Sequence, residues 1–429
     1  MSYDVIVIGA GAAGMMAAVG AGESGARTLL LEKNAKVGRK IGITGKGRCN
    51  VTNDCDRQTF MEHVVSNPRF LYSALDRLGP QDMMRRLESQ GVSLKVERGN
   101  RVFPVSDRSF DIIDALLRGV RKSGAQLCCG CSARRVETGP EGFTVFNDQK
   151  TYRAKAIILA TGGLSYPSTG STGDGYRMAK GLGLTTTEPC AGLSALITKE
   201  TWPKDAMGVT LKNVAVHITS KPDGKSIVRD FGEVLLTHFG VSGPVILSAS
   251  SRLQSWLKAK KKTFSEAEFC LHLDLKSALS HEQLDERLRR DLDKYRKRSF
   301  QNALDDLLPR KLIPVVVRLS QIPPEQPAAG ITKEQRRQVV NLLKDLTLTI
   351  TAARPIEEAI VTMGGVEVRQ IDPRTMMAKT VPGLFVCGEL LDVDALTGGF
   401  NLQIAFSTGL VAGESAASYC KRLPIRNGE

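Results

Sequence analysis

The stretch SYDVIVIGAGAAGMMAAVGAGESGARTLLLE, residues 2–32, decides the fold. Within it, Tyr3 to Ile8 is a run rich in β-branched residues, which predicts a strand buried on both faces. Ala12 to Ser24 has the small residues of a helix packed closely on that strand, and Thr28 to Leu31 predicts the next strand. A strand, a helix and a second strand within about 30 residues form a βαβ unit with parallel strands. The sequence therefore predicts an α/β fold.

Later segments first extend this sheet and then interrupt it. Ala156 to Ala160 and Leu384 to Cys387 are short apolar runs that end in glycine-containing turns, so both suit the same sheet. Between them, residues 193–244 alternate strand-like runs with turn residues, and residues 245–347 have a helical and strongly charged pattern. The predicted domains are a discontinuous Rossmann-like domain at residues 1–192 and 348–429, and an inserted domain at residues 193–347 that is β-rich first and helical afterwards.

Length and composition limit the class of protein. The chain has 429 residues, enough for two or three domains of roughly 100 to 200 residues each. A hydrophobic fraction of 42% with 24% charged residues excludes disordered and collagen-like chains. The net charge of +14 favours ligands that carry negative charge, phosphates among them. Nine cysteines without a secretory signal favour reduced thiols and a cytoplasmic location.

One uncharged stretch, Val5 to Gly22, is long enough to be considered as a membrane helix. Its composition argues against that reading, because five of its residues are glycine and Asp4 rather than a basic region precedes it. We therefore expect this stretch to form part of a folded core, and we expect no membrane association.

Three glycines follow the first predicted strand with the spacing Gly9-x-Gly11-x-x-Gly14, and Glu32 ends the second strand. Gly9 makes the tight turn, Gly11 lets the backbone approach a pyrophosphate, and Gly14 lets the helix pack on the strand. The helix N-terminus offers amides and a partial positive charge to phosphates, while Glu32 can accept hydrogen bonds from ribose hydroxyls. This pattern predicts a dinucleotide site, and the acid disfavours a 2′-phosphate on the ribose.

Residues 33–53, KNAKVGRKIGITGKGRCNVTN, follow Glu32 without a helical period. Their glycines permit backbone amides to converge on an anion, and Arg39 and Lys40 are among the cationic donors. This favours a loop that wraps around the phosphates and the flavin of a cofactor. The alternative is an ordinary solvated surface loop.

Several segments carry a resemblance to one known family. They are Gly38 to Asn53, Ala160 to Gly163 with Ser165-Tyr166-Pro167, Thr169 to Gly175, Thr237 to Pro244 and Gly383 to Ala405. Together they resemble the BaiN/YhiN-like (HI0933-like) bacterial FAD flavoproteins, a family that includes a dehydro-bile-acid reductase and an aminoacetone oxidase. The resemblance spans nearly the whole chain. It implies FAD held noncovalently in a two-part Rossmann-like domain, with the insert covering the flavin.

The resemblance also divides the cofactor among the matching segments. The implied contacts are Gly9, Gly11, Ala13 and Gly14 with the pyrophosphate, Glu32 with the ribose, Arg39, Lys40, Thr44 and Gly45 with the stretch from the diphosphate to the flavin, and Val136 with the adenine. Turns at strand ends beneath the cofactor are implied at Thr161 and Gly162 and at Gly388 and Glu389. Asn401 precedes a predicted helix whose N-terminus would stabilise negative charge on reduced flavin. The alternatives are a surface acid at Glu389 and plain close packing before that helix.

His238 and Arg354 are the candidate catalytic residues. His238 lies in a glycine-containing loop of the insert and could move protons near neutral pH, or be a structural loop histidine. Arg354 could clamp a substrate carboxylate or pair internally. The five histidines show no paired spacing, and Cys128 and Cys131 lie on a predicted strand that would aim them at opposite faces. No metal site is predicted.

The resulting hypothesis is a cytoplasmic FAD-dependent oxidoreductase in which a small organic substrate, or NAD(P)H, exchanges a hydride with noncovalent flavin. One alternative is an FAD-containing RNA-binding or RNA-modifying protein, which the basic runs at residues 260–262 and 294–298 favour. Acids interleave with bases from Glu282 to Asp293, so nucleic acid is the less favoured partner. A non-catalytic flavin sensor is a further alternative. The sequence predicts neither the substrate's identity nor the oligomeric state.

Overall fold

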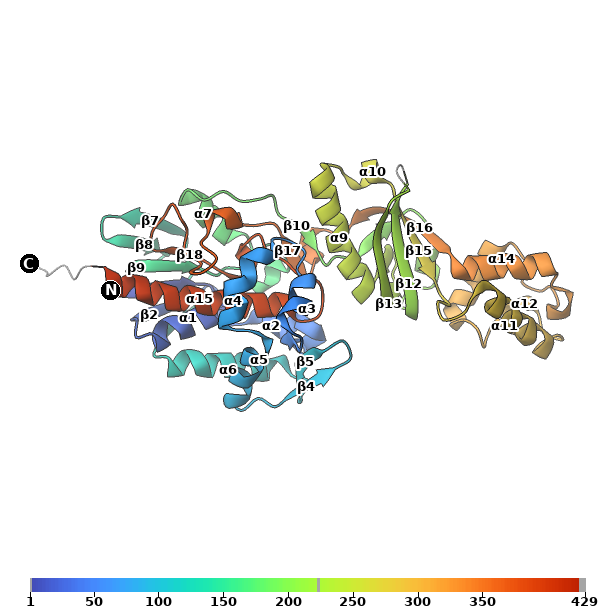
Figure 1. The fold of residues 1–429 in the computed structure, drawn as a ribbon, viewed down its shortest axis with the longest axis horizontal. Coiled ribbons are helices and arrows are strands. Elements are labelled where there is room, and N and C mark those ends of the chain that lie inside the picture. Colours follow the sequence, from blue (N-terminus) through green and yellow to red (C-terminus); the bar gives the residue numbers. More distant parts are fainter. Residues whose placement is uncertain (1, 222–223, 424–429) are drawn as a thin grey trace, which may run out of the picture. The chain divides into compact units, whose positions relative to one another are not determined.

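The computed structural model describes residues 2–221 and 224–423 (Figure 1). The chain divides into two compact units. The first, called the sheet unit below, comprises Met1–Gly192 and Ile356–Glu429, and the second, called the barrel unit, comprises Leu193–Pro355. None of the helices in the described ranges is both long and apolar enough to cross a membrane.

A mostly parallel sheet forms the core of the sheet unit. Its central strand β1 (Ser2–Ile8) lies parallel to β2 (Thr28–Glu32) on one side and to β9 (Thr151–Leu159) on the other. Every residue of β2 is buried, as expected for a parallel strand covered on both faces. The other strands are β6 (Gln126–Cys129) beside β2, β18 (Leu384–Val386) beside β9, and the antiparallel extension β8 (Gly142–Phe146) and β7 (Arg135–Gly139). The predicted α/β fold is confirmed.

The first and last helices of the sheet unit pack directly on each other. They are α1 (Ala12–Glu23) and α15 (Phe400–Arg422), drawn in blue and red in Figure 1. Glycines make this approach possible, because a β-carbon on Gly409 would lie 2.3 Å from the Ala13 carbonyl oxygen and one on Gly413 only 2.1 Å from that of Ala17. Contacts this short leave no room for a methyl group. The C-terminal helix is therefore an integral part of the nucleotide-type βαβ core.

Shorter elements surround this core. The helices are α2 (Arg39–Ile43), α3 (Arg57–Glu62), α4 (Tyr72–Arg77), α5 (Pro80–Ser89), α6 (Ser109–Lys122) and α7 (Asp174–Gly181). Two small antiparallel sheets join β3 (Thr52–Asn53), β5 (Arg101–Pro104) and β4 (Leu94–Glu97), and β10 (Cys190–Gly192) with β17 (Val361–Met363).

The barrel unit is built on a closed antiparallel barrel. Its strands, in spatial order, are β11 (Leu196–Thr198), β14 (Gly240–Ser242), β13 (Ser226–Leu236), β12 (Thr210–Ser220), β15 (Phe269–Asp274) and β16 (Leu346–Ala353). Along β12, buried Val214, Val216 and Ile218 alternate with the more exposed Ala215, His217 and Thr219. Such alternation separates an apolar inner face from a polar outer wall.

Helices complete the barrel unit. Helix α9 (Pro244–Lys260) buries Ala249, Leu253 and Leu257 in the same hydrophobic cluster as the inner faces of the strands. The others are α8 (Trp202–Asp205), α10 (Phe264–Ala267), α11 (His281–Lys294), α12 (Phe300–Ala303), α13 (Ile313–Ser320) and α14 (Lys333–Lys344). On α11 the apolar residues form one buried stripe, and most of the charged residues face solvent as on an ordinary amphipathic helix, whereas Asp291 is buried.

The barrel differs from the sequence expectation in two places. Residues 245–347, predicted to be helical, also contain β15 and the start of β16. Residues 348–355, predicted to return to the first domain, instead include the rest of β16, which pairs with β11 and β15. The alternation of buried residues along β16 indicates a strand, but such alternation carries no information about which sheet the strand joins.

Candidate functional site

The glycine turn after β1 has the geometry of a ligand-facing turn. Gly9 has a φ of +102°, and a β-carbon there would lie 2.6 Å from the Ala160 carbonyl oxygen, so the turns after β1 and β9 touch. A β-carbon on Gly14 would lie 1.7 Å from the Gly9 carbonyl oxygen. By contrast, a β-carbon on Gly11 would meet nothing within 4 Å. The fold itself requires Gly9 and Gly14, whereas Gly11 faces open space.

Helix α1 begins at this open space. Gly11 is its N-cap residue, in extended conformation, and makes no side-chain cap hydrogen bond. Ala13 lies in the first turn, where a β-carbon on Gly388 would approach the Ala13 β-carbon to 2.6 Å. Gly388 itself has a φ of +69° and donates its N–H to the Thr408 hydroxyl at 3.0 Å. The turn after β18 thus reaches the N-terminus of α1, whose amides and dipole favour an anionic group.

Glu32 connects the glycine turn with the residues that follow β2. Glu32 is only 7% exposed. Its carboxylate accepts a hydrogen bond from Ala10 N at 2.8 Å. It also accepts two from Asn34, from the backbone N at 2.8 Å and from Nδ2 at 2.7 Å. A carboxylate has about four acceptor positions, so these three bonds leave capacity for a ligand hydroxyl. The position of the carboxyl group and its hydrogen-bond acceptors suit the ribose contact predicted for Glu32.

A disulfide lies beside Glu32 and corrects one expectation. Cys128 and Cys131 are bonded to each other, although the sequence predicted reduced thiols on opposite faces of a strand. Strand β6 ends at Cys129, and Gly130, with a φ of +70°, turns the chain back. The turn brings Cys131 N to the Glu32 carbonyl oxygen at 2.8 Å. Strand alternation therefore does not apply to this cysteine pair.

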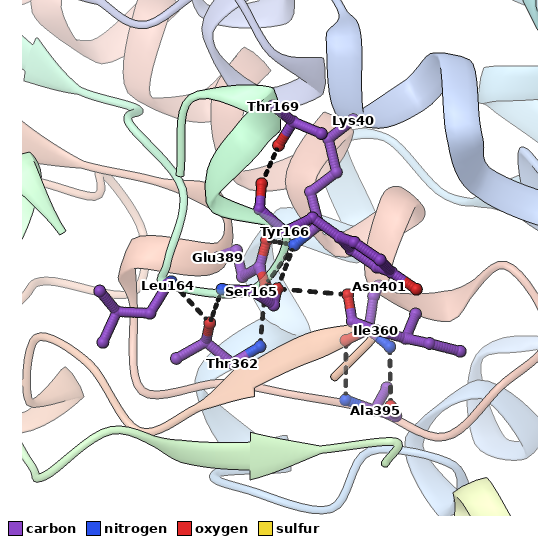
Figure 2. A network of polar contacts seen from close by, with 10 residues as sticks. All are labelled: Lys40, Leu164, Ser165, Tyr166, Thr169, Ile360, Thr362, Glu389, Ala395 and Asn401. Carbon is purple, nitrogen blue, oxygen red and sulfur yellow. Dashed lines mark hydrogen bonds and ion pairs between the residues drawn. The ribbon is translucent and has the colours of Figure 1, made fainter. Parts of the chain in front are cut away.

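Lys40 and Glu389, which the sequence placed at two different parts of the cofactor, meet in the structure (Figure 2). The Lys40 ammonium donates to both Glu389 carboxylate oxygens, at 2.8 and 2.7 Å, and to the Ser165 hydroxyl at 2.5 Å. Both charged side chains are mostly buried. The ion pair therefore joins the loop after β2 to the turn after β18, so Glu389 is not an isolated surface acid.

Thr362 and Ser165 complete this network, although neither was predicted from the sequence as a site residue. Glu389 accepts from Thr362 N at 2.8 Å and from the Ser165 hydroxyl at 3.1 Å, while the Thr362 hydroxyl accepts from Leu164 N at 2.8 Å and Ser165 N at 3.1 Å (Figure 2). A β-carbon on Gly163 would lie 2.3 Å from the Thr362 hydroxyl. The network therefore fixes the turn after β9. The pair Gly364-Gly365 just after Thr362 was an available signal for an unusual turn there.

Tyr166 stands out in the same loop because of its backbone. It has a φ of +52° although it is neither glycine nor asparagine and directly precedes Pro167. Its carbonyl oxygen accepts from Thr169 N at 2.8 Å and from the Thr169 hydroxyl at 2.7 Å, which hold this conformation. Burial, with a smaller contribution from Glu358, raises the pKa of the Tyr166 phenol, so the phenol keeps its proton at neutral pH.

Other predicted cofactor residues already have protein partners. The exposed Arg39 guanidinium donates to Asn34 Oδ1 at 3.0 Å, and the Thr44 hydroxyl donates to the Ile41 carbonyl oxygen at 2.8 Å. The Asn401 side chain accepts from Ala395 N at 2.9 Å and donates to the Ala395 carbonyl oxygen at 2.7 Å (Figure 2). In this arrangement Asn401 holds the loop in front of α15, and direct contact with a cofactor stays a prediction.

The remaining predicted residues lie at strand ends and edges. Val136 is buried in the edge strand β7 opposite Val145. Gly45 has a φ of +56° in the turn after α2, and Gly162 has a φ of +74° in the turn after β9. Thr161 lies between Ala160 and Gly162, and its hydroxyl is buried with no hydrogen-bond partner among the residues that the structure describes. A buried hydroxyl without a partner suggests that a ligand supplies one.

The candidate catalytic residues His238 and Arg354 belong to the barrel unit, where Phe239 lies beside both. The His238 ring packs edge-on against Phe239 at 4.9 Å between centroids, and the Arg354 guanidinium carbon lies 4.7 Å from the Phe239 centroid. His238 is exposed. The structure thus places these two residues near one aromatic ring, and their catalytic role stays a prediction.

Comparison with known proteins identifies the family. The family model of the HI0933-like protein Rossmann domain matches residues 3–415. The chain belongs to the HI0933-like family. The resemblance found in the sequence is confirmed, and it extends over the sheet unit and the barrel unit alike.

Two relatives span nearly the whole chain. A 3-dehydro-bile acid delta(4,6)-reductase from Clostridium scindens is 30% identical over 96% of this chain and 98% of its own. A ribosomal RNA dihydrouridine synthase from Escherichia coli K12 is 30% identical over 95% of this chain and 96% of its own. The fold is shared with a 3-ketosteroid-delta4-(5alpha)-dehydrogenase from Rhodococcus jostii RHA1, which matches with a TM-score of 0.52 over 97% of both chains at 13% identity. The prediction of an oxidoreductase is confirmed at the level of this family.

The ion pair of this HI0933-like chain gives a first testable prediction. Lys40→Met leaves the Glu389 carboxylate without its charged partner, so we expect the free energy of unfolding to fall by about 1–3 kcal/mol in urea titrations. The exposed Lys36 provides a control, because Lys36→Met removes the same charge nearby. The double variant Lys40→Met with Glu389→Gln should recover part of the loss. An equal loss in the Lys36 variant would contradict the role of the pair.

Proposed function

We propose that this chain is an FAD-dependent reductase that hydrogenates a carbon–carbon double bond conjugated to a carbonyl group. The observation that carries the FAD assignment is the free space at Gly11, at the uncapped N-terminus of α1 and close to the buried Glu32. This combination offers amides and a helix dipole to a pyrophosphate and a carboxylate to a ribose.

Three further features fit the cofactor. The turn at Gly388 meets Ala13 at the N-terminus of α1, the Lys40–Glu389 pair adds polar groups from two other loops, and the Thr161 hydroxyl is buried without a partner in the described part of the chain. FAD, when bound, supplies the hydride chemistry of its flavin ring. The protein residues orient the cofactor, exclude water and hold protons, as the protonated Tyr166 phenol does.

The names of the relatives favour a carbon–carbon double bond conjugated to a carbonyl group as the bond that is reduced. A 3-dehydro-bile acid delta(4,6)-reductase acts on double bonds conjugated to a ketone, and a dihydrouridine synthase saturates the uracil C5=C6 bond, which is conjugated to a carbonyl. For a double bond directly α,β to the carbonyl group, we propose that a hydride adds to the β carbon and a proton to the α carbon. We propose NAD(P)H as the hydride source, so that one NAD(P)H and one proton are consumed for each double bond reduced. His238 and Arg354 are the proposed substrate contacts of the barrel unit.

RNA is the second candidate substrate. Relatives from Escherichia coli and Haemophilus influenzae, both about 30% identical over nearly the whole chain, are ribosomal RNA dihydrouridine synthases. The barrel unit, Leu193–Pro355, contains 27 basic and 18 acidic residues, so it carries +9 of the net charge of +14. A small neutral or anionic enone gives no reason for this concentration of charge, whereas a polyanion does.

The test starts from the visible spectrum of the purified full-length chain. We expect a flavin spectrum that bleaches anaerobically with NADH or NADPH and recovers when a 3-oxo-Δ4,6 steroid or a uridine-containing RNA is added. Free FAD under the same conditions is the control. Colourless protein that added FAD cannot reconstitute would overturn the FAD assignment. Bleaching without recovery by either acceptor would overturn the reductase, whereas bound FAD that reacts with no reductant and no acceptor would favour the non-catalytic flavin sensor.

A further inference from the structure

We propose that the outer wall of the barrel, together with the lysines at one end of it, binds single-stranded RNA. The inference rests on the second candidate substrate above and adds the surface that would bind it. We call this surface the barrel track. It consists of Phe231, Arg229, His217 and His272 on the wall and of Lys221, Lys225, Lys260, Lys261 and Lys262 at the end.

The wall of the track is formed by three neighbouring strands. Arg229 of β13, His217 of β12 and His272 of β15 are opposite one another in the strand register and form one row across the sheet. The two imidazole rings lie 5.5 Å apart between centroids, tilted by 31°. Phe231 belongs to the next row and is 51% exposed, unusual for a large apolar side chain. Planar rings on an open sheet face are the groups on which unstacked bases stack.

A depression of about 470 Å³ opens at the same row. Its lining includes His217, His272, Arg229 and Lys344. Burial, with smaller contributions from Arg229 and His272, lowers the pKa of His217, so this imidazole is neutral near pH 7 and offers a flat polar ring rather than a charge. A volume of this size lies within the range of small-molecule sites, about 300–1,000 Å³.

Acidic side chains also line this depression, and one of the three is paired with a lysine. Asp274 forms an ion pair with Lys344 at 2.6 Å, and Asp345 accepts from His272 at 2.8 Å. Asp230 accepts from Phe231 N at 2.8 Å. Of the three carboxylates, Asp274 is therefore paired with a cation and Asp345 is held by a hydrogen bond, and Arg229 is the second cationic side chain of the lining. The Arg229 guanidinium is exposed and contacts only the Ser226 hydroxyl, at 3.3 Å, among the interactions of described residues.

The lysines gather where the β12–β13 hairpin meets α10. Lys221 N donates to the Glu268 carbonyl oxygen at 3.0 Å, and Ser220 N donates to the Lys225 carbonyl oxygen at 3.1 Å, which closes the hairpin end beside α10. Residues 260–262 lead directly into α10 from the end of α9. Figure 1 shows α10 and the hairpin at the same end of the barrel. Among the described residues, this end has five lysines against Glu266 and Glu268, so it carries an excess of positive charge.

The helix dipole of α9 explains only some of the lysines at this end of the barrel. Cations near its C-terminus stabilise the helix, which explains Lys258 and Lys260. It does not explain the lysines of the hairpin, which belong to no helix. The lysine ammonium groups at the end of the barrel can bind phosphates, and Arg229 and Phe231 follow them along β13. A single strand could therefore place its phosphates on the lysines and stack a base on Phe231. A duplex would not offer unstacked bases to these rings, so the track favours a single strand.

The test measures RNA binding by the purified full-length protein, using fluorescence anisotropy of a labelled 15-nucleotide oligouridylate. We expect log Kd to depend linearly on log salt. Replacing Lys260, Lys261 and Lys262 with alanine should reduce that slope by about 2, since each phosphate contact contributes about 0.7 for single strands. Phe231→Ala should weaken binding about tenfold with no change in slope. A duplex of the same length should bind more weakly than the single strand.

A matched control distinguishes binding at the barrel track from nonspecific attraction between RNA and the positively charged protein. Alanine at Arg121, Lys122 and Lys180 removes the same three positive charges from exposed positions of the sheet unit. No binding of wild type at 25 mM salt, or an equal loss in this control, would overturn the proposal. Anaerobic bleaching by NADPH is measured on the same samples. Absence of RNA binding in protein that still bleaches and reduces an enone would reject the track and leave the proposed reductase standing.

Discussion

Gly11→Val should abolish FAD retention while leaving the fold intact. The backbone at Gly11 is extended, and a β-carbon there meets no protein atom within 4 Å, so the larger side chain fits the empty protein. The same side chain would occupy the space in which a pyrophosphate approaches the N-terminus of α1. We expect the affinity for FAD to fall at least about 100-fold, equivalent to about 2.8 kcal/mol. Flavin fluorescence titration of the apoprotein measures this loss.

The control for Gly11→Val is Gly181→Val. A β-carbon on Gly181 would also meet nothing within 4 Å, but this glycine ends α7 and is not part of the glycine turn. Both variants should have a free energy of unfolding within about 1 kcal/mol of the wild type, because the added β-carbon meets no protein atom within 4 Å at either position. Unchanged FAD affinity in the Gly11 variant, with a folded protein, would show that the pyrophosphate does not lie at this turn.

Gly14→Ala, unlike Gly11→Val, should destabilise the fold itself. The added methyl group would lie 1.7 Å from the Gly9 carbonyl oxygen, so α1 would have to move away from β1. Overpacking against backbone atoms costs about 1–3 kcal/mol or more. A loss of about 3 kcal/mol corresponds to a melting temperature lower by roughly 6 to 12 °C in a unit of this size. Differential scanning calorimetry of the apoprotein checks this result without any cofactor.

Gly181→Ala serves as the control for the Gly14 variant, since the same methyl group there meets nothing within 4 Å. Its melting temperature should stay within about 1 °C of the wild type. If Gly14→Ala melts at the wild-type temperature, the close packing of α1 on the turn is not a requirement of this fold. The structural role assigned to Gly14 and the ligand-facing role assigned to Gly11 would then both have to be revised.

The sequence predicted the parts of the fold that local patterns determine. The βαβ unit, the later strands β9 and β18 and the final helix α15 follow from apolar runs and glycine turns. The strand β15 and the assignment of β16 to the barrel do not, because alternation identifies a strand without its partner. Family resemblance supplied FAD and most of the candidate residues, whereas spacing alone supported only a dinucleotide.

Within the site, contacts between distant loops were the hardest to predict. Lys40 and Glu389 are separated by 349 positions, and each appeared alone as a residue of the cofactor site. Thr362 carries no motif of its own, and its role becomes visible only where its hydroxyl meets Leu164 N and Ser165 N. The Cys128–Cys131 bond depends on the turn at Gly130, a backbone conformation that strand periodicity does not describe.

The packing of α15 on α1 has a consequence for how the chain is made. The N-terminal half of the sheet unit ends at Gly192, but its closing helix is not synthesised until after residue 400, when the entire barrel unit has already emerged. At about 5–20 residues per second, the ribosome needs roughly 10 to 45 s to span that interval. During this time the surface of α1 that receives Gly409 and Gly413 has no permanent cover. The barrel unit is continuous in sequence, so it can fold first, whereas the sheet unit must wait until α15 has been synthesised.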